Sequence, residues 1–242
     1  MRAVDLHVHS TKSDGSLTPT ELVDLALCKE LKAFALTDHD TTDGIDEALL
    51  YAKDKDIEVI PGVELSTEYK GRDIHMVGLY IDHKSTAFEN HIKNFRDARD
   101  LRNEKMCQLL RDEAGMDITY EALRAEDPDA VITRSHYAKY MLKHGYISNL
   151  KEAFERYIGD HAKYFVPREK ITPTQGIELI LSSGGIPILA HPTLYHMTKG
   201  QLNELVYTLK SAGLVGIEAI YSTYTSSEEE HIRTVAKNYN LK

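Results

Sequence analysis

Short apolar runs alternate with helical patterns along most of this chain of 242 residues, and this alternation restricts the folds open to it. The spacing predicts strands at residues 3–9, 33–38, 57–63, 74–81, 185–190 and 215–221. Two capping-box sequences, TPTE at 18–21 and TPTQ at 172–175, predict helices that run to about residues 31 and 181. Further helices are expected at residues 45–55, 200–212 and 226–239. Because such an alternation is typical of a mostly parallel sheet or barrel, we expect an α/β fold.

The alternation breaks between residues 86 and 159, where no strand is predicted. A stripe of side chains spaced three or four residues apart predicts one long helix that ends near Gly115. The stripe consists of Phe88, Ile92, Phe95, Arg99, Arg102, Met106 and Leu109. Shorter helices are expected at residues 134–143 and 150–157. We interpret residues 86–159 as a helical insertion or cap, carried by a barrel domain made of residues 1–85 and 160–242.

The charge balance argues against a broad nucleic-acid-binding surface. The chain has 29 Lys and Arg against 38 Asp and Glu, a net charge of −9, whereas long duplexes are held by clustered basic side chains. In the long helix, Arg96, Arg99 and Arg102 alternate with acidic residues. This pattern favours a solvated face of salt bridges over a stripe that contacts nucleic acid.

The sequence also bears on where the protein is found. No apolar run approaches the roughly 18–20 residues that a membrane-spanning helix needs, and the N-terminus has no signal-peptide pattern. Two cysteines, Cys28 and Cys107, are too few for a disulfide framework. We therefore expect a cytoplasmic protein that contacts neither a membrane nor long duplex nucleic acid. The sequence leaves the oligomeric state open.

Imidazoles and carboxylates lie at the ends of one predicted strand after another. His7 and His9 should point to one face of the first strand, because side chains alternate along a strand. Later candidates of the same chemistry are His39, Glu64, His75 and His191 on the following strands, with Asp14 in the first loop. Sites in barrels and parallel sheets are built where strands end. We therefore predict a metal site that holds more than one ion.

The donor types indicate which ions and which chemistry to expect. Imidazole and carboxylate without thiolate suit Mn²⁺, Fe²⁺ or Zn²⁺. Such a cluster performs hydrolysis, because one or two ions bind phosphoryl oxygens while another ionises a water molecule at neutral pH. Bound divalent ions also invert the local field. The net negative charge is therefore compatible with a small phosphorylated substrate. Asp38 and Asp40, on either side of His39, are expected to orient ligand imidazoles.

In these segments the chain resembles the PHP (polymerase and histidinol phosphatase) family of metal-dependent phosphoesterases. The matching segments are DLHVHS at 5–10, SDG at 13–15, LTDHD at 36–40, PGVE at 61–64 and LAHP at 189–192. The resemblance covers residues 1 to about 221. It implies an irregular (β/α)₇ barrel with two to three divalent ions, Mn²⁺ before Fe²⁺, Zn²⁺ or Mg²⁺. The insertion resembles that of the subgroup acting on nucleoside bisphosphates, AMP-like nucleotides and short oligonucleotides.

The resemblance also implies how the ligands are shared among the ions. The first ion would be held by His7, His9 and Glu64, the second by Glu64, His75 and His191, and the third by Asp14 and His39. The family's last motif, a Gly-Ser-Asp-x-His segment after the final strand, is absent from these 242 residues. We therefore expect a chain that lacks its last barrel strand and one ligand each of the first and third ions, and a natural protein that is longer.

Basic side chains of the insertion are candidates for binding substrate phosphate. Arg134 and His136 begin a predicted helix and resemble the Arg-x-His segment of the family's cap, where an arginine fork and helix-end N–H groups suit a phosphate. The alternative is a surface ion pair of Arg134 with an acid such as Glu126 or Asp129. Two further candidates, for a second phosphate, are Lys163 and Arg168.

Three functions fit the sequence. The first is a divalent-metal phosphoesterase that removes the 3′-phosphate of a nucleoside 3′,5′-bisphosphate or acts on an AMP-like nucleotide. Catalytic roles would fall to Asp14, His39, Glu64, His191 and Arg134. The second is a 5′→3′ exonuclease on short RNA or DNA, because cleavage of phosphate monoesters and diesters shares its metal chemistry. The third is a non-catalytic metal-binding module that lacks the last ligand motif.

Overall fold

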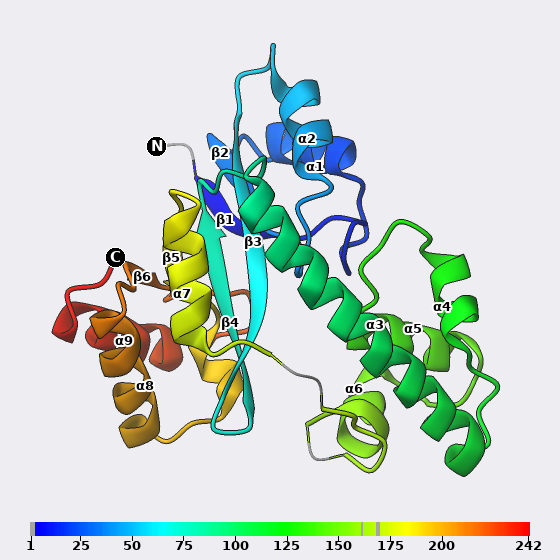
Figure 1. Ribbon diagram of the computed structural model, residues 1–242. Coiled ribbons are helices and arrows are strands. Elements are labelled where there is room, and N and C mark those ends of the chain that lie inside the picture. Colours follow the sequence, from blue (N-terminus) through cyan, green and yellow to red (C-terminus); the bar gives the residue numbers. More distant parts are fainter. Residues whose placement is uncertain (1–2, 161, 168–169) are drawn as a thin grey trace.

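The computed structural model describes residues 3–160, 162–167 and 170–242, and these form an α/β fold around one curled sheet, a half-barrel (Figure 1). The strand order in the sheet follows the chain from β1 to β6. The strands are β1 (Val4–Val8), β2 (Ala33–Leu36), β3 (Glu58–Tyr69), β4 (Arg72–Leu79), β5 (Ile186–Leu189) and β6 (Gly216–Ile217). The expected α/β class is therefore confirmed, whereas the (β/α)₇ closure and the missing last strand stay predictions.

Helices surround this sheet and fill the interruption between β4 and β5. The α-helices are α1 (Pro19–Cys28), α2 (Ile45–Ala52), α3 (Thr86–Ala114), α4 (Tyr120–Glu126), α5 (Arg134–Lys143), α6 (Leu150–Ala153), α7 (Pro173–Ser182), α8 (Lys199–Ser211) and α9 (Ser226–Asn238). A π-helical turn, Phe154–Ile158, continues α6, and a 3₁₀ turn, Pro192–Tyr195, follows β5. None of the described helices is long and apolar enough to cross a membrane.

Local signals set the helix starts as predicted, although α1 and α2 end at Cys28 and Ala52, three residues before their predicted ends. The hydroxyls of Thr18 and Thr172 accept hydrogen bonds from backbone N–H groups three residues later, which satisfies donors left free at a helix start. The long helix α3 ends at Gly115, whose φ of 67° is the left-handed conformation that lacks a penalty only in glycine. The seven-residue helix α4 was not predicted, since so short a segment carries little periodicity.

The direction of β4 corrects the expectation of a mostly parallel sheet. β4 runs antiparallel to both β3 and β5, while the other three pairings are parallel. The cause is local: Lys70 and Gly71, with φ of 51° and 76°, form a two-residue turn between β3 and β4. Positive φ at both central residues is the geometry of a tight hairpin, so the chain reverses instead of crossing over.

Two predicted strand lengths were also wrong. β3 continues to Tyr69, not 63, so Glu64 lies inside this strand and not at its end. The last strand was expected over residues 215–221, but β6 spans only Gly216–Ile217. As a result, Glu218 lies directly after β6 and not within a strand. Its side chain reaches His7 on β1.

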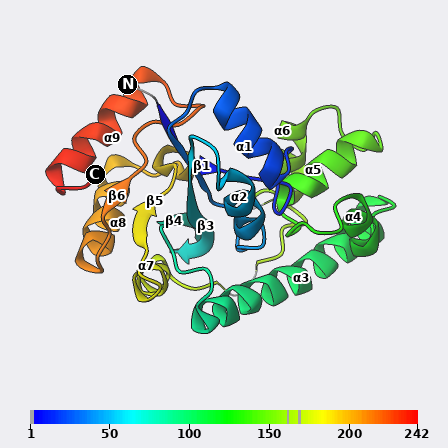
Figure 2. The same cartoon turned by 90° about the horizontal axis from the view of Figure 1, so that it is seen from above.

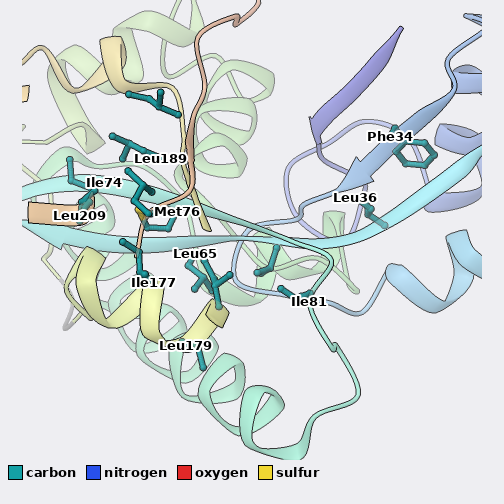
Figure 3. Packing of buried hydrophobic residues seen from close by; sticks show 14 of the residues in the cluster. Phe34, Leu36, Leu65, Ile74, Met76, Ile81, Ile177, Leu179, Leu189 and Leu209 are labelled. Carbon is teal, nitrogen blue, oxygen red and sulfur yellow. The ribbon is translucent and has the colours of Figure 1, made fainter. Parts of the chain in front are cut away.

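The buried apolar side chains form separate clusters. The largest, part of which is shown in Figure 3, covers the sheet and includes Phe34, Leu65 and Met76, with helices α1, α2, α7, α8 and α9 packed around it. A second cluster lies among α3, α4, α5 and α6, on the side of the sheet opposite α8 and α9 (Figure 2). Helix α3 belongs to both, with Ile92 in the first and Met106 in the second. The proposed division at residues 86 and 159 stays a prediction.

Candidate active site

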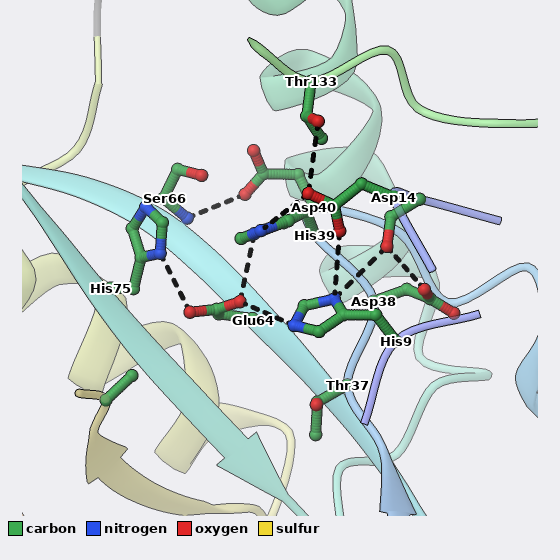
Figure 4. A network of polar contacts seen from close by, with 12 residues as sticks. His9, Asp14, Thr37, Asp38, His39, Asp40, Glu64, Ser66, His75 and Thr133 are labelled. Atoms are coloured by element: carbon green, nitrogen blue, oxygen red, sulfur yellow. Dashed lines mark hydrogen bonds and ion pairs between the residues drawn. The ribbon is translucent and has the colours of Figure 1, made fainter. Parts of the chain in front are cut away.

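The predicted ligands meet around the carboxylate of Glu64, which is 1 % exposed. Figure 4 shows His9, His39 and His75 turned toward this carboxylate, with Asp14 beside them. Three imidazole nitrogens lie 3.1 Å from its Oε2 atom and two lie 2.8 Å from its Oε1 atom. The Oε2 group comprises His7, His9 and His39, and the Oε1 group comprises His75 and His191. A single buried carboxylate therefore faces two sets of imidazoles, one on each oxygen.

The fold explains this convergence strand by strand. Pairing between β2 and β3 continues beyond β2 as a bridge between His39 and Glu64, so these two residues lie side by side. His75 is near the beginning of β4, not at its end. Because β4 is antiparallel, its beginning lies at the edge where the parallel strands β1, β2 and β5 end. The reversal that the sequence did not predict is what brings His75 to the cluster.

Asp14 adds a second carboxylate beside the cluster. Its oxygens lie 3.7 Å from His9 Nδ1 and 3.8 Å from His39 Nε2, too far for hydrogen bonds. Thr133, the N-cap of helix α5, donates to Asp14 Oδ2 at 3.2 Å. The start of helix α5 thus holds one of the predicted ligands in place.

Asp38 orients an imidazole as expected, but through an intermediate. It accepts hydrogen bonds from Ser10 N at 2.7 Å and from Ser13 Oγ at 2.5 Å. Ser13 Oγ in turn lies 3.3 Å from His9 Nδ1. Since the serine proton is given to Asp38, the serine oxygen is left to accept from the His9 ring, which directs His9 Nε2 toward Glu64.

Burial and mutual charge set unequal protonation among these groups. Burial alone would raise the pKa of Glu64, yet His39, His7 and His75 hold it well below its usual value. Burial opposes a charged His7, but Glu64 and Glu218 outweigh it and raise the pKa of His7 to about 10. Burial lowers the pKa of His39 to about 3. A neutral imidazole presents the lone pair that a metal ion needs.

The donor set fits divalent metal ions. Three overlapping groups place their ligand atoms within 4.8 Å of one another: His7, His9 and Glu64; His9, Asp14 and His39; and His39, Glu64 and His75. His39 Nδ1 is buried and makes no hydrogen bond among the described residues, although it lies 3.1 Å from Glu64 Oε2. An unpaired buried nitrogen is costly, and coordination to an ion would satisfy it. The number and identity of the ions stay predictions.

The cluster opens into a cavity of about 540 Å³. Arg134 reaches this cavity from α5 and forms ion pairs with Asp73 at 2.9 Å and Asp160 at 2.6 Å. Arg134 therefore lines the cavity and also forms ion pairs, the alternative expected from the sequence, but its partners are not Glu126 or Asp129. The Arg134 guanidinium thus lies between Asp73 on β4 and Asp160, which follows the π-helical turn.

His136 and Lys163, two other predicted phosphate contacts, are not among the cavity-lining residues that the structure describes. His136 is 5 % exposed, and its Nδ1 accepts a hydrogen bond from Thr133 N in the capping box of α5. Lys163 forms an ion pair with Glu113 at 3.3 Å. Arg168 lies outside the residues that the structure describes. Of the four predicted substrate contacts, the described part of the chain brings Arg134 to the cavity.

The predicted exposure of two arginines of α3 was wrong. Arg99 and Arg102 were expected on a solvated face, but each is 5 % exposed and lines the cavity. Arg99 contacts Asp40, which also accepts a hydrogen bond from Ser66 N at 2.8 Å. The signal was present, because both arginines fall on the same stripe as the buried Ile92. Two further residues, Lys170 in the cavity wall and Glu218 behind the cluster, had no sequence signal.

Comparisons with known proteins agree with this geometry. The profile of the family described as PHP domain matches residues 5–240. A 5′-3′ exoribonuclease of Haemophilus influenzae is 40% identical over 237 residues, which cover 98% of this chain and 86% of that protein. A 3′,5′-nucleoside bisphosphate phosphatase of Chromobacterium violaceum is 31% identical over 242 residues, covering 100% of this chain and 85% of that protein.

Solved structures show the same fold. An amidohydrolase from Chromobacterium violaceum, solved with bound sulfate and no metal, has a TM-score of 0.92 at 30% identity and covers 98% of this chain and 84% of its own. A protein of Bifidobacterium adolescentis assigned as a metal-dependent phosphoesterase has a TM-score of 0.87 at 26% identity, with coverage of 99% and 85%. With the family match over nearly all residues and the histidine cluster around Glu64, this chain belongs to the PHP domain family of metal-dependent phosphoesterases.

Proposed function

We propose that this enzyme removes a phosphate from small nucleotides that carry a second phosphate, foremost the 3′-phosphate of a nucleoside 3′,5′-bisphosphate. One observation carries the proposal: the cavity that contains the histidine cluster is also lined by basic side chains that do not belong to this cluster. These are Arg99, Arg102, Arg134 and Lys170. A phosphate that is not cleaved needs such cations, because the divalent ions are engaged with the reacting group.

The cavity also offers an apolar surface for a nucleobase. Phe154, which is 39 % exposed, and Leu194, which is 43 % exposed, both line it. Exposed aromatic and aliphatic side chains stack on bases without selecting a sequence. A nucleotide therefore fits this cavity better than a phosphorylated sugar or amino alcohol, which has no flat apolar group to bury.

Each part of the site has a distinct task in the proposed reaction. Glu64, His7, His9, His39, His75, His191 and Asp14 would hold the divalent ions. Those ions, when bound, polarise a phosphoryl oxygen and lower the pKa of a water molecule. Arg134 binds the substrate and counters charge that develops on the phosphate, while its ion pairs with Asp73 and Asp160 fix the direction of its guanidinium.

A second candidate function is 5′→3′ trimming of short RNA. It is favoured by the 40% identity to the Haemophilus influenzae protein named as an exoribonuclease. A 5′-phosphorylated oligomer presents the same elements as a bisphosphate, namely one phosphate to cleave and a neighbouring one to bind. The ligand set is common to both reactions, so rates must separate them.

The test is phosphate or nucleotide release by chelator-treated protein with and without added Mn²⁺. We expect release only after Mn²⁺ is restored, with a higher kcat/KM on adenosine 3′,5′-bisphosphate than on adenosine 3′-monophosphate, which keeps the phosphate to be cleaved and lacks the second one. A short RNA with a 5′-phosphate is assayed in parallel. Faster cleavage of the RNA would assign the exonuclease, and no metal-stimulated release from any of the three would refute a phosphoesterase on nucleotides.

The pH profile should report on Lys170, which contacts Asp73 in the cavity wall. Burial lowers the pKa of Lys170 to about 8, although the charges of Asp40 and Glu68 oppose the shift. The ammonium is therefore charged below this pH and loses its proton above it. We expect kcat/KM for the bisphosphate, which reflects the free enzyme, to fall as pH rises through about 8.

The matched variants are Lys170→Arg and Lys163→Arg. A guanidinium stays charged at all accessible pH values, so Lys170→Arg should move the alkaline fall upward. Lys163 is paired with Glu113 away from the cavity, so its variant should keep the wild-type profile. An unchanged alkaline limb in Lys170→Arg would show that another group titrates there.

A further inference from the structure

Glu218 connects two strands that lie at opposite ends of the sheet order. It directly follows β6, which pairs with β5 at the end of the sheet order, and the Glu218 N–H donates to Leu189 O at 2.9 Å. Its side chain nevertheless reaches β1, because the sheet is curled: Glu218 Oε1 lies 3.2 Å and Oε2 lies 3.3 Å from His7 Nδ1. The carboxylate thus joins the first strand to the last across the back of the histidine cluster.

The same carboxylate fixes a second member of the cluster. Glu218 Oε2 accepts a hydrogen bond from the backbone N–H of His191 at 2.7 Å. His191 has φ of 23°, a strained value for a residue with a side chain. Such a conformation persists only where surrounding contacts hold it, and the short bond to Glu218 is one of those contacts.

The contact with His7 decides which ring nitrogen is available. A carboxylate beside Nδ1 favours the proton on that nitrogen, which leaves the lone pair on Nε2. His7 Nε2 is the atom that lies 3.1 Å from Glu64 Oε2, inside the cluster. His191 presents its own Nε2 to the other oxygen of Glu64, at 2.8 Å. Glu218 therefore acts on one imidazole from each side of the central carboxylate.

We infer that Glu218 is a positioning residue that aligns His7 and His191 for metal binding without binding the metal itself. It is not among the cavity-lining residues, and none of the three candidate ligand groups contains it. This inference rests on the proposed metal centre. A purely architectural tie between β6 and β1 is the competing explanation, and it predicts lower stability with unchanged metal affinity.

The experiment compares Glu218→Ala and Glu218→Gln with wild type, all metal-free and full-chain. Mn²⁺ alone is titrated by calorimetry, and thermal unfolding of the metal-free forms is recorded alongside. We expect the Kd for Mn²⁺ to rise about 10- to 100-fold in Glu218→Ala. The rise should be smaller in Glu218→Gln, whose amide oxygen still accepts from His191 N–H. If the alanine variant does not fold, the Kd for Mn²⁺ of the glutamine variant tests the inference instead.

The control is Glu228→Ala. Glu228 closes the capping box at the start of α9 and contacts no residue of the cluster. Its removal should lower the unfolding temperature without changing the Kd for Mn²⁺. Nitrogen chemical shifts of the histidine rings in the Zn²⁺-loaded forms give a second readout: the His7 Nδ1 shift, which reports the contact with Glu218, should change in Glu218→Ala and stay at its wild-type value in Glu228→Ala.

The outcomes separate this inference from the proposed function. Wild-type Kd and wild-type ring shifts in both Glu218 variants would overturn the positioning role while leaving the metal centre intact. Equal changes of Kd in the Glu218→Ala and Glu228→Ala variants would also overturn it, because the effect would then follow stability. A wild-type protein that binds no Mn²⁺ would overturn the metal centre, and the inference with it.

Discussion

Replacing Glu64 with glutamine is expected to lower metal-dependent phosphate release by about three orders of magnitude. Both oxygens of this carboxylate face imidazoles, three on Oε2 and two on Oε1. A glutamine has one oxygen and no charge, and its NH₂ group would point donor hydrogens at ring nitrogens or bound ions. This isosteric change therefore removes a ligand oxygen from one side of the cluster and the negative charge from both sides.

The measurements are kcat for the bisphosphate and the Mn²⁺ content of the purified variant. Glu58→Gln is the matched control, because Glu58 begins the same strand β3 and is exposed. In metal-free Glu64→Gln, the pKa of His7 should fall below its value of about 10, since a neighbouring anion is gone. A variant that retains wild-type kcat and metal content would show that the carboxylate is not a bridging ligand.

Removing the Arg99 guanidinium should produce the largest loss of stability, about 3–5 kcal/mol in the free energy of unfolding for Arg99→Met. Arg99 pairs with Asp40, and the side chains are 6 % and 0 % exposed. Without the arginine, the Asp40 carboxylate would stay buried beside Ser66 with its principal counter-charge lost. The pair also joins helix α3 to the loop after β2.

Urea unfolding of three variants tests this expectation. Arg96→Met is the control, because Arg96 lies on the same helix and pairs with Asp43, but the two side chains are 34 % and 52 % exposed. An exposed pair is worth roughly 0–1 kcal/mol. The double variant Arg99→Met/Asp40→Asn should recover part of the loss, since no unpaired charge remains buried. Equal losses in Arg99→Met and Arg96→Met would contradict a buried ion pair.

The sequence predicted those features that depend on neighbouring residues. Capping boxes located the starts of α1 and α7, because the cap and its N–H partner lie within one turn of the chain. The meeting of His7, His39 and His191 followed from a general rule, that parallel strands end at one edge. Both kinds of inference need no knowledge of distant contacts.

Features that depend on tertiary contacts were not predicted. The antiparallel course of β4 follows from the turn at Lys70 and Gly71, which the alternation of strands and helices does not reveal. Arg99 lies on the buried stripe of α3 and Arg96 does not, but no local pattern indicates that Arg99 pairs with the buried Asp40. Glu218 touches His7 across 211 positions of sequence, so no spacing indicates the contact.

Helix α3 has a consequence for which sequence changes this fold can accept. It passes without a break from the apolar cluster at the sheet, at Ile92, to the second apolar cluster, at Met106. Each residue added to a helix turns everything beyond it by about 100°. The orientation of Arg134 relative to the histidine cluster therefore depends on the number of residues between Ile92 and Met106. A single-residue insertion or deletion between them would rotate Arg134 away from the cluster, whereas a substitution would not.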